Sequence, residues 1–321
     1  MPRDQKLPDS LVYGPVPSRR LGLSLGVDIV PYKTCTYDCI YCQIGRTPRT
    51  TVTRRPYIEK DRILGELQTR LDAGARPDYI TVGGSGEPTL NSEVGAIIRE
   101  VQQISTFPVA VLTNGSLLGD AAVQKDLQAA DVVLPSFDGH DAESFQRINR
   151  PHADISFEKM AAGLAGFRKQ YAGRIWLEIF IVSGINDTKE AMEALNPHLA
   201  DIDPDRIHLN TAVRPPAEKY AAQVPADRLQ ALAEVLGPKA EVIAEFARTH
   251  TPAHEKDMEA AILDMLLRRP CTAVDIADGL AMDPKTVADT MAQLTAAGLV
   301  EIRETGDQVY YFRPGRQADQ P

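Results

Sequence analysis

Three of the four cysteines lie within eight residues, as Cys35, Cys39 and Cys42. Thiolates bunched in this way can hold zinc or an iron–sulfur cluster, and the number of ligands helps to decide between the two. A structural zinc site takes four protein ligands, but the first histidine is His140 and the remaining cysteine is Cys271. A four-iron cluster held by three thiolates keeps one iron open. The spacing therefore favours an iron–sulfur site for substrate chemistry, with a zinc knuckle or a chance cluster as the alternative.

Small and polar residues follow three short β-branched segments further along the chain. They are GGSGEP at 83–88, Thr-Asn-Gly at 113–115 and Ser-Phe-Asp-Gly at 136–139. Glycines allow backbone carbonyls to approach a ligand ammonium group, and Glu87 offers a countercharge. Folds of the α/β class bind ligands at the carboxyl ends of their strands. Each segment alone also fits ordinary turn chemistry, but their order after the cysteines predicts one shared ligand site.

The spacing CxxxCxxC, with Tyr41 directly before the last cysteine and a strand just upstream, resembles the signature of the radical S-adenosylmethionine (radical SAM) superfamily. The resemblance covers roughly residues 12 to 215. It implies that Cys35, Cys39 and Cys42 bind a [4Fe–4S] cluster and that SAM binds the open iron. It further implies that the reduced cluster cleaves SAM to a 5′-deoxyadenosyl radical, which abstracts hydrogen from a substrate.

The same resemblance implies the residues that contact SAM. Tyr41 is expected to pack near the adenine. The segment 83–88 is similar to the GGE motif that holds the SAM amino group, with a serine inserted between the glycines. The strand-end residues fall where the superfamily meets the SAM ribose and carboxylate. The predicted cofactor contacts are therefore Tyr41, Gly84, Ser85, Gly86, Glu87, Asn114, Ser136 and Asp138, and no catalytic residue is assigned.

Three other segments resemble a narrower branch, the bacterial and archaeal Fe–S oxidoreductases that are similar to wyosine-tRNA biosynthesis enzymes. These segments are residues 14–22, 147–152 and 210–216. The wyosine enzymes carry an extra upstream cysteine triad for a second cluster, with a lysine between those cysteines. This chain has no cysteine before Cys35, so it offers no auxiliary cluster and the wyosine reaction does not carry over. A tRNA base, another anionic substrate and a peptide all stay open as substrates.

Six short β-branched runs alternate with segments of helical periodicity. The runs are 27–30, 79–83, 109–113, 132–135, 175–182 and 207–213. Asn91 is expected to cap the helix after the second run, and Asp187 with Glu190 is expected to form a capping box. Alternating strands and helices predict right-handed βα units with a parallel sheet. About six units predict an α/β fold, a partial (β/α)6 TIM-like barrel.

The pattern changes after the polar segment 248–255 (RTHTPAHE). We therefore predict a radical SAM partial barrel over residues 1–250 and a winged-helix-like domain with a polar tail over 251–321. The second part is expected to hold three helices, the last two at 273–280 and from 284, and strands at 299–303 and 308–312. Cys271 is expected to be a small buried residue.

Charge is distributed unevenly along the chain. The net charge is −9, yet residues 14–56 contain seven basic and two acidic side chains. An anionic substrate and an acidic one-electron donor such as flavodoxin or ferredoxin both fit such a region. Residues 253–321 carry seven basic and twelve acidic side chains, which disfavours sequence-specific DNA binding. The predicted substrate or donor contacts are Arg19, Arg20, Arg147, Arg150, His152 and Arg214.

The composition sets the remaining limits. With 321 residues, 43% of them hydrophobic and 25% charged, the chain has the size of about two globular domains. It contains no apolar stretch near the roughly 20 residues of a membrane helix, and residues 1–10 lack the apolar region of a secretory signal. We expect a cytoplasmic protein without a membrane partner.

A second class of function competes with the enzyme. The cysteine loop can be an iron–sulfur or zinc sensor that signals through the winged-helix domain. In that case the polar residues Glu87, Asn114 and Ser136 have no chemical role.

Overall fold

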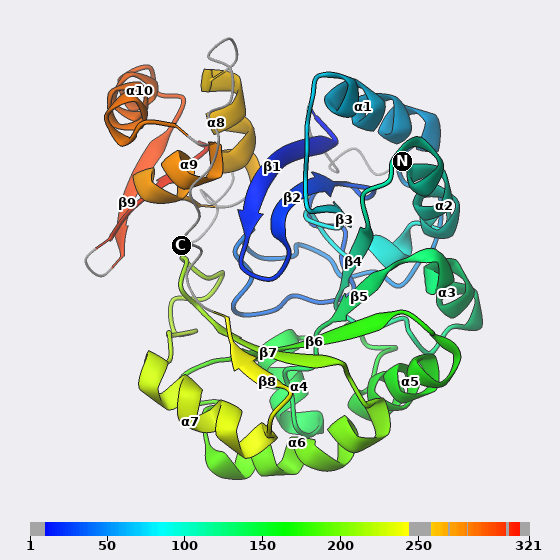
Figure 1. The fold of residues 1–321 in the computed structure, drawn as a ribbon. Coiled ribbons are helices and arrows are strands. Elements are labelled where there is room, and N and C mark those ends of the chain that lie inside the picture. The colour runs from blue at the N-terminus through cyan, green and yellow to red at the C-terminus, as the bar shows by residue number, and fades with distance from the viewer. Residues whose placement is uncertain (1–9, 244–257, 269, 281, 306–307, 315–321) are drawn as a thin grey trace.

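The computed structural model describes residues 10–243, 258–268, 270–280, 282–305 and 308–314 (Figure 1). Its main sheet has eight strands that lie side by side in chain order. They are β1 (Val12–Ser18), β2 (Gly22–Val27), β3 (Tyr79–Val82), β4 (Val109–Thr113), β5 (Val132–Pro135), β6 (Arg174–Ile181), β7 (Arg206–Thr211) and β8 (Ala240–Val242). The pair β1–β2 is antiparallel, and every later pair is parallel. The predicted α/β fold with a parallel-dominated sheet is confirmed.

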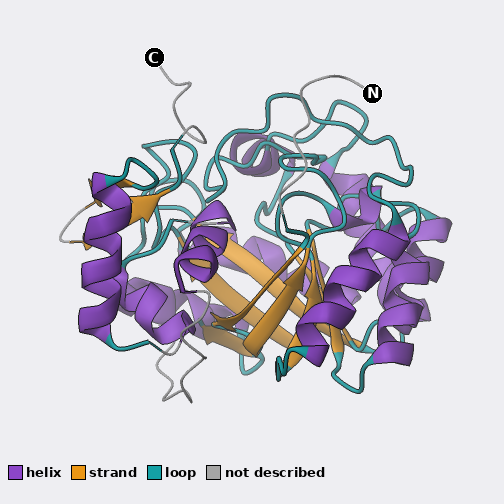
Figure 2. Ribbon diagram, turned by 90° about the horizontal axis from the view of Figure 1, so that it is seen from above, coloured by secondary structure: helices purple, strands orange, loops and turns teal. Residues whose placement is uncertain are grey.

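Helices connect these strands. They are α1 (Lys60–Asp72), α2 (Val94–Ile104), α3 (Ala121–Asp126), α4 (Ala142–Asn149), α5 (Phe157–Gln170), α6 (Lys189–Ile202) and α7 (Ala226–Leu236), with the short 3-10 helices η1 (Pro88–Leu90) and η2 (Leu127–Ala129). Figure 1 shows most of them around the outside of the curved sheet, and Figure 2 shows the strands in the middle with loops across one side. No helix in the described ranges is both long and apolar enough to cross a membrane.

Side chains that alternate along the strands divide the core into an outer and an inner part. In β4, Val109 and Val111 belong to the large core between the sheet and the helices, whereas Ala110 belongs to a smaller cluster with Leu21 and Trp176. Leu21 ends the turn between β1 and β2. The tip of this hairpin therefore packs against inward-facing side chains and fills part of the barrel interior.

Five of the six predicted strands agree with β3 to β7 to within two residues. The predicted strand at 27–30 is wrong, because β2 ends at Val27 and the buried Ile29 and Val30 belong to the loop after it. Strand β1 was not expected because Pro15 and Pro17 cannot donate to a sheet. An edge strand tolerates them, and the register of β1 shifts between Tyr13 and Val16.

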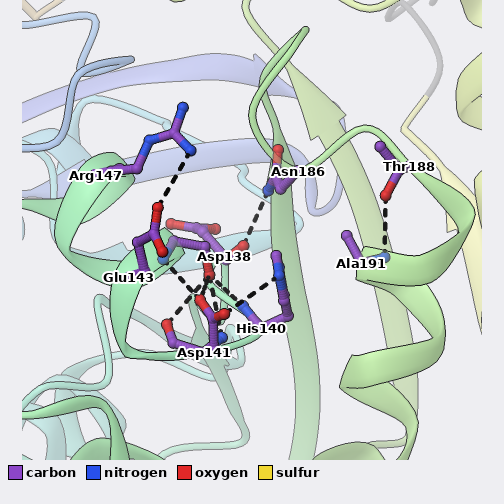
Figure 3. Close-up of polar contacts among 9 residues, drawn as sticks. Asp138, His140, Asp141, Glu143, Arg147, Asn186, Thr188 and Ala191 are labelled. Atoms are coloured by element: carbon purple, nitrogen blue, oxygen red, sulfur yellow. Dashed lines mark hydrogen bonds and ion pairs between the residues drawn. The ribbon is translucent and has the colours of Figure 1, made fainter.

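Both helices begin one or two residues later than the predicted caps, although Asn91 Oδ1 still accepts a hydrogen bond from the Glu93 amide at 2.9 Å. Helix α2 begins after Glu93, while the Asn91 side chain donates to the Ile29 carbonyl. Helix α6 begins after Thr188, whose hydroxyl accepts a hydrogen bond from the Ala191 amide at 3.1 Å (Figure 3). Several cap-forming residues stand in a row at each place, so composition alone does not select the cap.

The C-terminal unit consists of α8 (Met258–Arg268), α9 (Ala273–Leu280), α10 (Pro284–Ala296) and the antiparallel pair β9 (Glu301–Thr305) and β10 (Gln308–Phe312). Cys271 is fully buried in its core. The unit contacts the barrel through Val16 of β1, and the Tyr310 hydroxyl donates to the Val213 carbonyl at 2.6 Å. Its assignment as a winged helix stays a prediction, and the predicted boundary at 250/251 lies outside the described residues.

Candidate functional site

The three predicted ligand cysteines lie on residues 28–56, called here the cluster loop, which follow the carboxyl end of β2. The loop contains no regular helix or strand and is held by its neighbours. The Lys33 amide donates to the Ser85 carbonyl at 2.7 Å, and the Ile40 amide donates to the Ile148 carbonyl at 3.0 Å. All three cysteines are half-buried. The loop is therefore fixed between the end of β3 and the end of α4.

Each of the three cysteine sulfurs accepts a hydrogen bond from the side chain of a lysine or an asparagine, and these donors come from three different parts of the chain. The pairs are Lys33 Nζ with Cys42 Sγ at 3.3 Å, Asn114 Nδ2 with Cys35 Sγ at 3.6 Å and Asn149 Nδ2 with Cys39 Sγ at 3.5 Å. Donors of this kind orient a ligating thiolate and stabilise its charge. The sequence predicted Asn114 as a SAM contact and missed Lys33 and Asn149 as site residues.

Over the described part of the chain, no three His, Cys, Asp or Glu side chains converge as ligands of one metal. Zinc holds its ligands at about 2.0–2.3 Å from one centre. In an iron–sulfur cluster each cysteine binds a different iron, so the sulfurs stand further apart. The count of three neighbouring thiols, one ligand short of a structural zinc site, fits a cluster better than zinc.

Burial disfavours the charged form of two of the thiols. It raises the pKa of Cys35 to about 12, with the Glu87 carboxylate adding to the effect, and it raises the pKa of Cys39 well above its ordinary value. Burial also opposes the charge of Lys33, but the sulfur of Cys42 beside it raises the pKa of that ammonium group overall. Metal ligands must be thiolates, so a bound metal and Lys33 together stabilise the negative sulfurs.

The glycine-rich segment that follows β3 exposes part of its backbone to solvent. Gly84 is exposed and Gly86 half-buried, whereas Ser85 is buried and donates through its amide and its hydroxyl to Asp28 at 2.8 and 2.9 Å. A Cβ on Gly86 would lie 2.0 Å from the Thr34 carbonyl oxygen. Glycine is therefore required for close packing on the cluster loop. Backbone groups, rather than the Ser85 side chain, are left to face a ligand.

Glu87 is buried and its carboxylate is fully engaged. One oxygen accepts hydrogen bonds from the Thr89 amide, the Thr89 hydroxyl and the Thr113 hydroxyl, and the other accepts from the Asn114 amide at 2.7 Å. Burial raises the pKa of Glu87, although these donors oppose the shift. The structure places this carboxylate between the ends of β3 and β4, where it positions Asn114.

Asp138 has a similar place at the end of β5. Its carboxylate accepts hydrogen bonds from the Tyr41 hydroxyl at 2.6 Å, the Asn149 side chain at 2.7 Å and the Phe180 amide at 2.8 Å. Its carbonyl accepts from the Asn186 side chain (Figure 3). The Tyr41 ring stacks on Phe180 with centroids 3.8 Å apart. Asp138 therefore links the cluster loop to α4 and β6 through these hydrogen bonds.

Ser136 is half-buried and lies beside a polar network in the barrel interior. Its backbone bridges to Glu178, whose carboxylate pairs with Arg20 and accepts from Asn210 Nδ2 at 2.9 Å. Arg19 Nη1 donates to Asn210 Oδ1 at 3.0 Å. Burial, helped by Arg19, lowers the pKa of Arg20 to about 10. The sequence missed Glu178 because it stands inside a strand.

The other predicted substrate or donor contacts separate into two places. Arg147 and Arg150 line a pocket of about 480 Å³ at the end of α4. The His152 amide donates to the cluster loop at 2.9 Å. Arg214 is largely buried and pairs with Asp275 of α9 at 3.2 Å. The structure thus places Arg214 at the contact with the C-terminal unit, away from the pocket.

The chain is similar in sequence to a known family and to several proteins. The family model described as the Radical SAM superfamily matches residues 29–195, just over half of this chain. A protein of Brachyspira hyodysenteriae named GTPase Obg is 36% identical over 301 residues, 92% of this chain and 44% of that protein. A UPF0026 protein of Methanocaldococcus jannaschii is 37% identical over 66% of both chains. This chain thus spans less than two thirds of the length of these relatives.

A solved structure shares the fold. The crystal structure of a radical SAM methyltransferase from Sphaerobacter thermophilus matches with a TM-score of 0.55 and 16% identity. The match covers 68% of this chain and 65% of that one. Identity at this level supports the fold alone.

Proposed function

This chain belongs to the radical SAM superfamily, and from that premise we propose that Cys35, Cys39 and Cys42 hold its [4Fe–4S] cluster, with SAM bound beside them. Members of the family bind both cofactors, and this chain is a radical SAM enzyme. When bound, the cluster supplies an open iron for the amino and carboxyl groups of SAM and, once reduced, the electron that cleaves SAM to a 5′-deoxyadenosyl radical.

The hydrogen bonds to the three sulfurs carry the proposal. Lys33, Asn114 and Asn149 reach the thiols from separate elements at 3.3 to 3.6 Å. A cysteine cluster formed by chance has no reason to collect one donor for each sulfur. The donors therefore support a preorganised ligand set at the carboxyl ends of the strands.

We assign two kinds of role to the predicted SAM contacts. The exposed backbone at Gly84, the half-buried backbone at Gly86 and the half-buried side chain of Ser136 are proposed to bind SAM. A second set of side chains acts as positioning residues, because hydrogen bonds to the framework already engage them. This set is Tyr41, Ser85, Glu87, Asn114 and Asp138.

The substrate is proposed to lie over the barrel interior. Half-buried polar side chains line it next to Ser136, namely Arg20, Glu178 and Asn210. Such a lining suits a polar substrate better than an apolar one. The name GTPase of one relative is not carried over, since this sequence contains no G-x-x-x-x-G-K-[ST] motif for phosphate binding.

Radical SAM enzymes generally need an external one-electron donor. We propose an acidic flavodoxin or ferredoxin in this role. The alternative of an iron–sulfur or zinc sensor is not favoured, because the chain belongs to a family of enzymes and offers three neighbouring thiols where a structural zinc site takes four ligands.

Formation of 5′-deoxyadenosine tests the proposal. The protein is reconstituted anaerobically with iron and sulfide and is incubated with SAM and dithionite. We expect 5′-deoxyadenosine from the wild type and from Cys271→Ala, whose sulfur lies in the other core, but none from Cys42→Ala. A wild-type sample with a complete four-iron cluster that forms no 5′-deoxyadenosine would support the sensor instead.

A further inference from the structure

Strand β9 forms one edge of the hairpin in the C-terminal unit. Within the described residues it pairs only with β10, whereas β10 also bridges to Cys271 on its other side. Figure 1 shows β9 on the side of the unit that faces away from the barrel. The outer edge of β9 therefore presents backbone N–H and C=O groups to which another strand can bind.

Two apolar side chains stand in solvent beside this edge. Residues 301–304 are all exposed, and Ile302 is 51% exposed. Val309 of β10 is 40% exposed. It lies on the same face of the hairpin as Ile302, because the register places Tyr311 opposite Ile302 and Val309 opposite Glu304. The hairpin thus leaves a small apolar surface next to an edge that accepts a further strand.

One acidic and one basic residue flank the isoleucine. Glu301 and Arg303 both project from the opposite face of β9. The guanidinium group of Arg303 lies over the Phe312 ring, 5.0 Å from its centre, and Glu301 makes no ion pair within the described part of the chain. The two charges therefore stand at equal distances on either side of Ile302.

Two-fold symmetry restricts how two copies of such a strand pair. In an antiparallel pair of identical strands, one residue faces its own copy and its neighbours face each other in reverse order. A pair centred on Arg303 places two guanidinium groups opposite each other, and one centred on Glu301 or Glu304 does the same with carboxylates. A pair centred on Ile302 instead places Glu301 opposite Arg303 twice. Opposite charges at facing positions stabilise a sheet, and like charges destabilise it.

From this complementarity we propose that β9 pairs antiparallel with β9 of a second copy of this chain, with Ile302 at the two-fold axis. Strands β10 and β9 and their copies then form one four-stranded sheet. The interface buries Ile302 against its copy, with Val309 beside it, and pairs the outer backbone groups of β9. A second copy fits this edge best, because one strand supplies both members of each ion pair.

The inference does not depend on the proposed function. The C-terminal unit contacts the barrel through Val16 and through residues 213–214, and β9 contains none of the predicted cofactor contacts. Failure to form 5′-deoxyadenosine would therefore leave the dimer standing, and a monomer would leave the cofactor site standing. Because β9 has only five residues, the interface is small, and small interfaces bind weakly. Association is therefore measured up to high protein concentrations.

Sedimentation equilibrium of the reconstituted full chain tests the pairing. In Arg303→Glu, glutamates face each other at both flanking positions, and in Glu301→Arg, arginines do. We expect each single variant to raise the dimer Kd about tenfold or more. The double variant Glu301→Arg/Arg303→Glu should return Kd close to the wild-type value, because both ion pairs are restored in reverse. Lys285→Glu, on an exposed residue of α10, is the control and should dimerise like the wild type.

An equal mixture of the two single variants gives the sharpest outcome. A mixed dimer contains two Arg–Glu pairs, so we expect the mixture to associate about as tightly as the wild type although each variant alone pairs poorly. Association no stronger than that of the single variants would overturn the pairing around Ile302. A wild-type dimer that persists unchanged in both single variants would place the interface elsewhere and would also overturn it. A monomeric wild type would do the same and would assign the charges of β9 to protection of its edge or to a different partner.

Discussion

The cluster end of the barrel and the C-terminal unit both contain cysteine but use it differently. Cys39 is half-buried and accepts a hydrogen bond from Asn149. Cys271 is fully buried in an apolar core with Ile276 and Met291. Exposure and an apolar surrounding therefore separate the predicted ligand cysteine Cys39 from the packing cysteine Cys271.

The buried polar groups differ between the two regions as well. At the cluster end, the carboxylates of Glu87 and Asp138 are buried and hold segments that are distant in sequence. The described core of the C-terminal unit is built from aliphatic and aromatic side chains and attaches to the edge strand β1. Hydrogen bonds to buried carboxylates thus fix the geometry of the cluster end, whereas apolar packing holds the C-terminal unit together.

The largest expected effect is on iron content. Cys39→Ala removes a predicted ligand and should reduce bound iron and visible absorbance to background, while the far-ultraviolet circular dichroism stays close to wild type. Cys271→Ala should keep its four irons because its sulfur lies in the other core. Four irons retained in Cys39→Ala would refute the ligand assignment.

The next effect is on stability. In Asp138→Asn, an amide NH2 replaces an oxygen that accepts hydrogen bonds, so at least one of the donors Tyr41, Asn149 and Phe180 loses its partner. An unsatisfied buried group costs about 1–3 kcal/mol, and urea unfolding of the apoprotein should show a loss of this size. Asp289→Asn, at an exposed position on α10, is the control. Equal unfolding free energies for the two variants would contradict the positioning role of Asp138.

A smaller effect is expected on the reduction potential. Lys33 Nζ donates to Cys42 Sγ at 3.3 Å and also to the Gly45 carbonyl. A positive charge beside a ligand stabilises the reduced, more negative cluster, so Lys33→Met should lower the potential by on the order of 50 mV, where 59 mV corresponds to about 1.4 kcal/mol for one electron. An EPR-monitored redox titration measures it, with the exposed Lys189→Met as control. A raised potential would show that Lys33 does not act on the sulfur electrostatically.

The smallest effect concerns the attachment of the C-terminal unit. Arg214→Ala removes the pair with Asp275, and a partly exposed pair contributes up to about 1 kcal/mol. Amide hydrogen exchange in α9 should accelerate about fivefold, since 1.4 kcal/mol corresponds to a factor of ten. Loss of 5′-deoxyadenosine formation without faster exchange would instead restore the sequence-based prediction that Arg214 contacts substrate or donor.

The parallel sheet could be predicted because β-branched runs and turn residues are local signals. The segment at 109–113 coincides with β4, and the cysteine spacing is equally local. Ile262, Met265 and Leu266 stand at helical spacing in the sequence, and all three are buried in the C-terminal core. In contrast, β8 has only three residues, too few to produce a pattern.

The hydrogen bonds that position the site residues could not be predicted, because they join residues that are distant in sequence. Asn149 and Cys39 are 110 residues apart, and no periodicity links them. Glu87 and Asp138 were expected to face SAM, since a carboxylate after a strand has the same sequence signal whether it points to a ligand or to the framework. Only the fold shows which donors surround it.

The central claim is that three thiolates leave one iron open to SAM. EPR spectra of the dithionite-reduced wild-type protein, recorded with and without SAM, test it most directly. We predict that SAM changes the g values of the cluster signal. An unchanged spectrum from a sample with four irons per chain would show that a fourth protein ligand closes the site, and the account would then be wrong.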